Sequence, residues 1–150
     1  MIYLGADHRG YELKEKIKQW LDEFGYTHED LGALEYNKDD DYPDFSTAVA
    51  AAVALSLSKG QSSRGILVCG SGIGIAVAAN KIKGVRAGTA TNAEQVRASV
   101  NDEDLNVLAL SADYTEEDVA KEIIKTFLET KFSGEERHVR RLNKIEELEK

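Results

Sequence analysis

The sequence predicts an α/β protein: a three-layer α/β/α sandwich built on a Rossmann-like, doubly wound sheet of five parallel strands. Short apolar segments of strand length alternate regularly with longer segments of helical period. Two of the apolar segments, 65–69 and 106–110, are almost continuously hydrophobic, as is typical of strands that are covered on both faces. No repeat or low-complexity segment interrupts the alternation. Regular alternation of this kind favours parallel strands joined by right-handed crossovers.

The strands are expected at Ile2–Ala6, Tyr26–Leu31, Gly65–Cys69, Val85–Ala90 and Asn106–Leu110. The second contains His28, Glu29 and Asp30, which favour a position at the edge of the sheet. Parallel strands place their carboxyl ends at one edge, and ligands of such sheets bind outside that edge. The candidate site therefore lies at the junctions that follow the strands, which are Gly5–Gly10, Cys69–Gly74, Thr89–Asn92 and Ser111–Tyr114.

The helices are expected where apolar residues recur at helical spacing between residues that start or stop a helix. The first helix has an apolar stripe of Leu13, Ile17, Trp20, Leu21 and Phe24 and ends at Gly25. The others are expected at about Asp44–Lys59, at Gly74–Lys83, from Asn92, from Thr115 and at Glu135–Leu148. Asn92 and Gln95 have the spacing of a capping box. The connection Gly32–Pro43 is the only one long enough to be a functional element of its own.

Length, charge and cysteine content exclude several classes of protein. A chain of 150 residues with 42% hydrophobic and 31% charged residues fits one globular domain, 1–150. The net charge of −8 and a pI of about 4.9 disfavour nucleic acid and anionic membranes as partners. Polar residues at Asp7–Arg9 disfavour a signal peptide. The single cysteine, Cys69, cannot form an internal disulfide, so we expect a reducing, cytoplasmic location.

The most informative segment is the glycine-rich turn after the third strand, Cys69-Gly70-Ser71-Gly72-Ile73-Gly74. Its glycines leave backbone N–H groups uncovered, so the turn can bind an anion or a developing oxyanion. A thiol beside these groups is stabilised as the thiolate. The segment lacks the arginine of a phosphatase loop, the lysine of a Walker loop and the last glycine of a dinucleotide-binding turn. The alternative is a tight turn in which Cys69 is simply a small buried residue.

Other polar residues allow both functional and structural interpretations. Asp7 can orient a hydroxyl group or cap the first helix, and His8 can bind a phosphate or carry a proton. Tyr42 can place its phenol over the site or simply begin the second helix. Asn101, with the aspartate that follows it, ends the fourth helix and favours a capping role when taken alone.

The C-terminal segment and the acidic loop also carry candidate residues. Arg137 and Arg141 lie four residues apart on one helix face, where they can clamp a phosphate or pair with neighbouring glutamates. The run Asp39–Asp41 has no histidine or glutamate at ligand spacing, so we expect a solvated loop and no metal.

Together, these motifs resemble ribose-5-phosphate isomerase type B, whose family includes the galactose-6-phosphate isomerase subunits and related sugar isomerases. The resemblance runs in order from about Ile2 to Ile145. Its motifs are Asp7-His8, Tyr42-Pro43, the Cys69–Gly74 turn, Ala78-Ala79-Asn80-Lys81, Val85-Arg86-Ala87, Asn101-Asp102, Asn106-Val107-Leu108 and Arg137-His138. The resemblance implies an aldose–ketose isomerase that acts on a sugar phosphate and uses neither a metal nor an organic cofactor.

The resemblance also implies a role for each candidate residue. Cys69 is the base that moves a proton between C2 and C1 of the sugar through an enediolate, and Ser71, at the family's usual threonine position, assists at O1 and O2. The backbone N–H groups of Gly70, Gly72 and Gly74 form the oxyanion site, and Asp7 and Tyr42 contact the sugar. Asn101 binds the O1/O2 end. The phosphate is bound by His8, Arg137 and Arg141. The family builds this site between two subunits. A homodimer or dimer of dimers is therefore implied, with the helix at about 135–148 packing on the partner.

Two positions depart from the family pattern. Val100 stands where the family has a histidine that helps to open the sugar ring, and Asp113 stands where the family has a phosphate-binding arginine. Valine cannot move a proton, and an acid close to a phosphate repels it. We therefore expect slow turnover limited by ring opening, or a substrate with more open-chain form. An isomerase of unphosphorylated sugars, a non-catalytic sugar-phosphate-binding subunit and, more remotely, a flavin-binding module remain alternatives.

Overall fold

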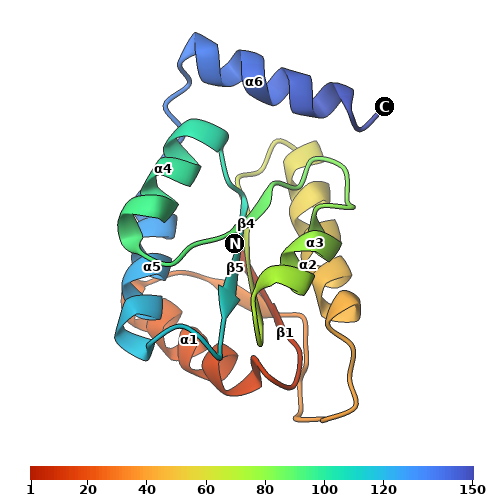
Figure 1. Ribbon diagram of the computed structural model, residues 1–150, viewed down its shortest axis with the longest axis vertical. Helices are drawn as coiled ribbons and strands as arrows, with labels where there is room; N and C mark the ends of the chain where they lie inside the picture. Colours follow the sequence, from red (N-terminus) through yellow and green to blue (C-terminus); the bar gives the residue numbers. More distant parts are fainter.

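A five-stranded, all-parallel sheet forms the middle layer of the computed structural model, which describes residues 1–150 (Figure 1). Its strands are β1 (Ile2–Ala6), β2 (His28–Asp30), β3 (Arg64–Cys69), β4 (Ala87–Thr89) and β5 (Val107–Ser111). The order β2-β1-β3-β5-β4 places β3 in the centre and β2 at an edge, as the charged residues of β2 predict. Both edge strands are shorter than expected, because each has a hydrogen-bonded neighbour on one side only. The predicted fold class is confirmed.

Helices cover both faces of the sheet and one end of it (Figure 1). They are α1 (Tyr11–Phe24), α2 (Tyr42–Ser58), α3 (Ile73–Ala79), α4 (Ala93–Glu103), α5 (Glu117–Glu129) and α6 (Glu136–Glu147). Helices α1, α4 and α5 pack on one face, and α2 and α3 pack on the other. Helix α6 lies across the end from which β5 starts, where it contacts α4. None of these helices is both long enough and apolar enough to cross a membrane.

Alternation along the central strand divides its side chains between two hydrophobic cores. Ile66 and Val68 join the core with α1, α4 and α5, whereas Leu67 and Cys69 join the core with α2 and α3. Burial on both faces explains why this strand is apolar throughout. As a result, Cys69 lies at the carboxyl end of the central strand, on the side covered by α2 and α3.

The start of α2 and the end of α3 differ from those expected from the sequence. Helix α2 starts at Tyr42 rather than near Asp44, because Pro43 is favourable in the first turn of a helix. Helix α3 ends at Ala79 rather than Lys83, because the side-chain amide of Asn80 makes hydrogen bonds of 2.8 Å to both the N–H and the C=O of Ala87 in β4. These two hydrogen bonds fix the start of the edge strand.

Side-chain capping fixes the start of α4. Asn92 caps α4 as predicted, since its side chain accepts a hydrogen bond of 2.8 Å from the N–H of Gln95. The reciprocal bond of a capping box goes instead to Thr91, whose N–H donates to the side chain of Gln95. Helix α5 begins at Glu117, two residues later than expected from Thr115.

Candidate active site

A pocket of about 230 Å³ opens beyond the carboxyl ends of β1, β3 and β5, at the predicted edge of the sheet. Its lining residues are Asp7, Arg9, Tyr42, Cys69, Gly70, Ser71, Gly74, Asp113 and Tyr114. The fold thus brings together residues from the turn after β1, the start of α2, the turn after β3 and the junction after β5. Most of the predicted site residues meet here, and Arg9 and Tyr114 join them without having been singled out.

Cys69 lines this pocket although only 4% of the residue is exposed. Its Sγ accepts a hydrogen bond of 3.2 Å from the backbone N–H of Gly72. Gly72 has a φ of 75°, and a Cβ there would lie 3.0 Å from the backbone of Leu110. Glycine is therefore required for the turn to fold back beneath β5 and present its N–H to the sulfur. Gly72 is buried and makes this contact rather than lining the pocket.

Tyr42 lies directly against the turn. A Cβ at Gly74 would lie 2.7 Å from Cζ of Tyr42 and 3.0 Å from its hydroxyl oxygen. The phenol thus closes one side of the pocket, while 39% of the residue remains exposed. Ser71 is exposed at the opening, and its Oγ accepts a hydrogen bond of 3.2 Å from the N–H of Ile73. Both hydroxyl groups are available to a ligand in the pocket.

Asp7 holds the turn before α1 and also lies at the pocket. One carboxylate oxygen accepts hydrogen bonds from the N–H groups of Arg9 (3.0 Å) and Gly10 (3.1 Å), so it caps the turn that leads into α1. Asp7 is 5% exposed and also lines the pocket. Gly10 allows the turn to approach β3, since a Cβ there would lie 2.4 Å from the carbonyl oxygen of Val68. The turn that holds Asp7 is therefore packed directly on the strand that holds Cys69.

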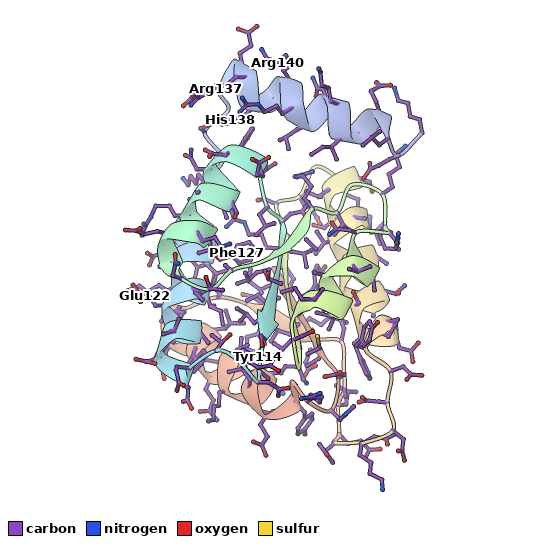
Figure 2. All side chains as sticks on the ribbon, in the orientation of Figure 1. Tyr114, Glu122, Phe127, Arg137, His138 and Arg140 are labelled. Atoms are coloured by element: carbon purple, nitrogen blue, oxygen red, sulfur yellow. The ribbon has the colours of Figure 1, made fainter.

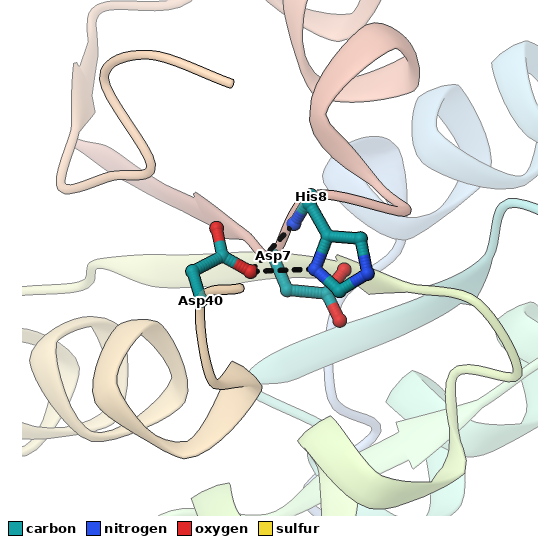
Figure 3. Close-up of side chains that lie close together, drawn as sticks. All are labelled: Asp7, His8 and Asp40. Carbon is teal, nitrogen blue, oxygen red and sulfur yellow. Dashed lines mark hydrogen bonds and ion pairs between the residues drawn. The ribbon is translucent and has the colours of Figure 1, made fainter. Parts of the chain in front are cut away.

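His8 does not line the pocket but is held beside it by the loop between β2 and α2 (Figure 3). One oxygen of Asp40 lies 2.7 Å from Nδ1 of His8 and accepts its backbone N–H at 2.9 Å. Asp7, His8 and Asp40 each offer a possible metal-ligand atom within 4.8 Å of the others. Hydrogen bonds within the loops account for the closeness of these three side chains, because one carboxylate oxygen of Asp7 and one of Asp40 already accept backbone N–H groups. Oδ2 of Asp40 is buried and has no partner.

An ion pair between Arg9 and Asp113 forms another side of the pocket. A Cβ at Gly70 would lie 2.7 Å from Nε of Arg9, so the guanidinium lies directly on the glycine turn. The N–H of Asp113 donates to the carbonyl oxygen of Gly70 at 3.1 Å, which fixes the position of the carboxylate. The sequence leads us to expect an isolated acid that repels a phosphate, and the structure corrects this expectation because a guanidinium neutralises Asp113.

Val100, the other position that departs from the family pattern, lies in the core of the protein. Val100 is fully buried in the core shared by α1, α4 and α5. A side chain at this position therefore faces the interior of the chain rather than the pocket. The valine itself therefore offers no group to a sugar, and the expectation that its lack of a proton donor limits ring opening stays a prediction.

Asn101, Arg137 and Arg141 lie outside the pocket, at the other end of the chain. Figure 2 shows Arg137 on α6 and Tyr114 at opposite ends of the molecule. Asn101 is near the end of α4, and its carbonyl oxygen accepts the N–H of Ser133, which precedes α6. Nε of Arg137 pairs with a carboxylate oxygen of Glu135 at 3.0 Å. Within one chain, these predicted substrate-binding residues therefore lie far from Cys69. Their proposed roles require a second chain.

The residues that sequence reasoning missed follow directly from the junctions it identified. Arg9 lies in the junction after β1, beside Asp7, and Tyr114 lies in the junction after β5. Neither residue has a motif of its own, and only their positions after parallel strands could have drawn attention to them. Within the pocket, the only cation is Arg9, against the two acids Asp7 and Asp113.

A cysteine at the end of the central parallel strand, beside a glycine turn at the binding edge, gives an α/β enzyme site that can stabilise a thiolate and a developing oxyanion. The sequence model of the ribose/galactose isomerase family matches residues 2–145, so the chain belongs to this family. It is an aldose–ketose isomerase of the kind found among type B ribose-5-phosphate isomerases. The resemblance stated from the sequence motifs is confirmed.

Individual relatives are similar over nearly the whole chain. Ribose-5-phosphate isomerase B of Mycobacterium tuberculosis is 36% identical over 149 residues, which cover 99% of this chain and 90% of that protein. The structure of ribose-5-phosphate isomerase B from Clostridium thermocellum superposes with a TM-score of 0.91 and 42% identity, covering 99% of this chain and 96% of that one. The structure of the Mycoplasma genitalium enzyme with bound ribulose-5-phosphate has a TM-score of 0.92 and 35% identity, covering 99% and 95%.

Proposed function

We propose that this protein interconverts ribose 5-phosphate and ribulose 5-phosphate by a proton transfer that uses Cys69 as the base. The observation that carries the proposal is the position of Cys69, which lines the pocket at the edge of the sheet and whose Sγ accepts the N–H of Gly72 at 3.2 Å. The choice of substrate is supported by the relatives that bear this enzyme name and by the relative with bound ribulose-5-phosphate.

The proposed chemistry needs only groups that the pocket contains. The Cys69 thiolate removes the proton from C2 of the open-chain aldose, and the electron pair left on carbon moves to the carbonyl oxygen O1, giving an enediolate. Backbone N–H groups of Gly70 and Gly74, with the hydroxyl of Ser71, stabilise the negative charge on oxygen. The thiol then returns the proton to C1, and a proton moves from O2 to O1 to give the ketose. No electrons leave the sugar, so the proposal includes no metal or organic cofactor.

The pocket of one chain is smaller than most small-molecule sites and contains little positive charge. Its volume of about 230 Å³ is below the range of roughly 300–1,000 Å³ that is usual for small-molecule sites. Arg9 is its only cation, and Arg9 is already paired with Asp113. We propose that a second copy completes the site in a homodimer or dimer of dimers, with α6 packing on the partner. The partner's Asn101, Arg137 and Arg141 would then supply the missing contacts.

A complementation experiment tests the shared site. Cys69→Ala removes the base, and Arg137→Ala combined with Arg141→Ala removes the cations, so each variant alone should be inactive. After unfolding and refolding together, mixed dimers contain one site with both sets of residues intact, so roughly a quarter of the wild-type activity should return. Light scattering measures the oligomeric state of each variant. A failure to recover activity, with mixed dimers demonstrably formed, would exclude a site in which the arginines of one subunit act with Cys69 of the other.

The function itself is tested by measuring ribulose 5-phosphate formation from ribose 5-phosphate, with D-ribose and a hexose phosphate as competing substrates. Cys69→Ala should lower kcat by roughly 10²- to 10⁴-fold, the usual contribution of a general base. Thermal unfolding of the same variant controls for damage to the core around Cys69. Retention of wild-type kcat by a folded Cys69→Ala variant would exclude the proposed base, and turnover of D-ribose alone would exclude the phosphorylated substrate.

The proposal assigns this activity to one domain, residues 1–150, in the cytoplasm. The cytoplasmic location rests on the chemistry, since a thiol base has to remain reduced and Cys69 has no other cysteine to pair with. The alternative of an isomerase for unphosphorylated sugars loses its main support, because that support was the charge of Asp113, which Arg9 neutralises.

A further inference from the structure

We infer that Arg9 binds the phosphate group of the substrate within the Cys69 pocket, and that Asp113 positions the Arg9 guanidinium for this role. The inference rests on the proposed function, because it assumes that the pocket takes a sugar phosphate. It adds a residue that distinguishes phosphorylated from unphosphorylated sugars in the chain that also supplies the base.

Arg9 is the only positively charged residue that lines the pocket. Its guanidinium lies on the face of Gly70, the residue immediately after the proposed base, since a Cβ at Gly70 would lie 2.7 Å from Nε and 2.9 Å from Cζ. A side chain at position 70 would displace the arginine. The absence of one gives the guanidinium access to the same backbone segment whose N–H groups are exposed to the pocket.

Both members of the ion pair are fixed by the backbone around the site. The N–H of Arg9 donates to the carboxylate of Asp7 at 3.0 Å. The N–H of Asp113 and the hydroxyl of Ser111 both donate to the carbonyl oxygen of Gly70, at 3.1 and 2.7 Å. The ion pair therefore links the turn after β1 to the junction after β5 across the glycine turn. Such anchoring at both ends reduces the entropy that an arginine loses when it binds a ligand.

The pair leaves most of the arginine's hydrogen-bonding capacity unused. Arginine has five N–H donors in a planar fork, and Asp113 accepts from Nη2. The Arg9 side chain is 58% exposed, against 29% for Asp113, so the fork remains open to a ligand. A planar fork is well suited to phosphate oxygens, which it can bind through two parallel hydrogen bonds. Because Asp113 cancels its net charge, Arg9 contributes directed hydrogen bonds more than long-range attraction.

The test compares Arg9→Gln with Lys16→Gln, a matched loss of positive charge on the neighbouring helix. Lys16 pairs with Glu117 at 2.6 Å and does not line the Cys69 pocket. Arg9→Gln should raise KM for ribose 5-phosphate roughly 10- to 100-fold, as expected for the loss of charged hydrogen bonds. Competitive inhibition by inorganic phosphate should weaken by the same factor. In Arg9→Gln, kcat and the inhibition constant of D-ribose should change little. Lys16→Gln should match the wild type in every measurement.

Further variants separate phosphate binding from a structural role. Arg9→Lys keeps the charge without the fork, so its KM should lie between those of the wild type and Arg9→Gln. Asp113→Asn keeps an oxygen that accepts from Arg9 and removes a negative charge, so KM should fall several-fold. Asp113→Ala also removes the acceptor that holds the guanidinium, so its KM should exceed that of Asp113→Asn, and equal KM values in the two variants would contradict the positioning role of Asp113.

The outcomes distinguish this inference from the proposed function. If the wild type isomerises ribose 5-phosphate and Arg9→Gln leaves its KM and its inhibition by phosphate unchanged, Arg9 does not bind the phosphate. If Arg9→Gln weakens D-ribose and ribose 5-phosphate equally, the arginine shapes the pocket without recognising phosphate, and the inference is also wrong. If the wild type does not turn over ribose 5-phosphate at all, the proposed function fails first.

Discussion

Replacing Gly74 with alanine should test the proposed sugar contact of Tyr42 separately from the contribution of Tyr42 to stability. The added Cβ would lie 2.7 Å from Cζ of Tyr42 and 3.0 Å from the phenolic oxygen, whereas unstrained carbon contacts are about 3.5–4.0 Å. The ring must therefore move by roughly 1 Å, and a displacement of that size at an active site can lower the rate by about 10²-fold. We expect kcat/KM for ribose 5-phosphate to fall by about 10- to 100-fold.

The same substitution should cost little stability. Gly74 lies within α3 and its φ is not positive, so alanine fits the backbone, where it is favoured over glycine by about 1 kcal/mol. Tyr42 is 39% exposed and can rotate toward solvent, so its movement offsets only part of this gain. Alanine also keeps the backbone N–H of the turn. Urea denaturation should therefore give a free energy of unfolding within about 1 kcal/mol of the wild type.

A double-mutant cycle with Tyr42→Ala decides whether the effect passes through the phenol. In the Tyr42→Ala background nothing remains for the new Cβ to displace, so Gly74→Ala should cause no further loss of kcat/KM. The reasoning is refuted if Gly74→Ala retains wild-type kcat/KM, or if it lowers kcat/KM by the same factor whether or not Tyr42 is present.

Three further predictions concern stability and the position of Val100. Lys14 is fully buried and donates hydrogen bonds to Asp30 and, at 2.7 Å, to the carbonyl oxygen of Ala33. Because Lys14→Met leaves the charge of Asp30 without this partner, it should lower the free energy of unfolding, measured in urea, by about 3–5 kcal/mol. Burial raises the pKa of Asp30, but hydrogen bonds from Lys14, Gly32 and Lys18 outweigh it and hold the pKa below its ordinary 3.8. Stability should therefore be lost as the pH falls below about 3.8, and an acid titration of Asp30→Asn should show a smaller loss. Val100→His should lower the stability, measured by thermal unfolding, by about 2–4 kcal/mol without raising kcat, because it places an unpartnered imidazole in the core. A higher kcat would show that position 100 reaches the sugar.

The sequence predicts the sheet well because burial dominates its pattern. β3 is apolar throughout since both of its faces are covered, and charged residues mark β2 as an edge strand. The end of α3 was not predictable in the same way. Asn80 leaves the helix because its amide binds Ala87, a contact set by tertiary packing that local helical spacing does not contain.

The residues of the pocket could likewise be predicted where they depend on local sequence, and could not be predicted where they depend on contacts between distant residues. The positions of Asp7 and the Cys69–Gly74 turn could be predicted because each follows a strand at the binding edge, and Tyr42 was identified by the Tyr42-Pro43 motif at the start of α2. The role of Arg9 could not be predicted, because it depends on Asp113, which is 104 positions away in the sequence. A linear motif identifies which residues follow a strand, but it does not reveal which of them neutralise one another.

These contacts couple phosphate recognition to assembly. Within one chain, Asp7 contributes a negative charge to the pocket, while Arg9 and Asp113 cancel. A phosphate dianion that entered this pocket would meet directed hydrogen bonds from Arg9 but no net positive field. The cations that could supply such a field lie on α6, at the opposite end of the same chain. In the proposed homodimer, α6 of the partner would bring them to the pocket, so phosphate selectivity should require the assembled protein, whereas the thiol and its glycine turn are complete in each chain.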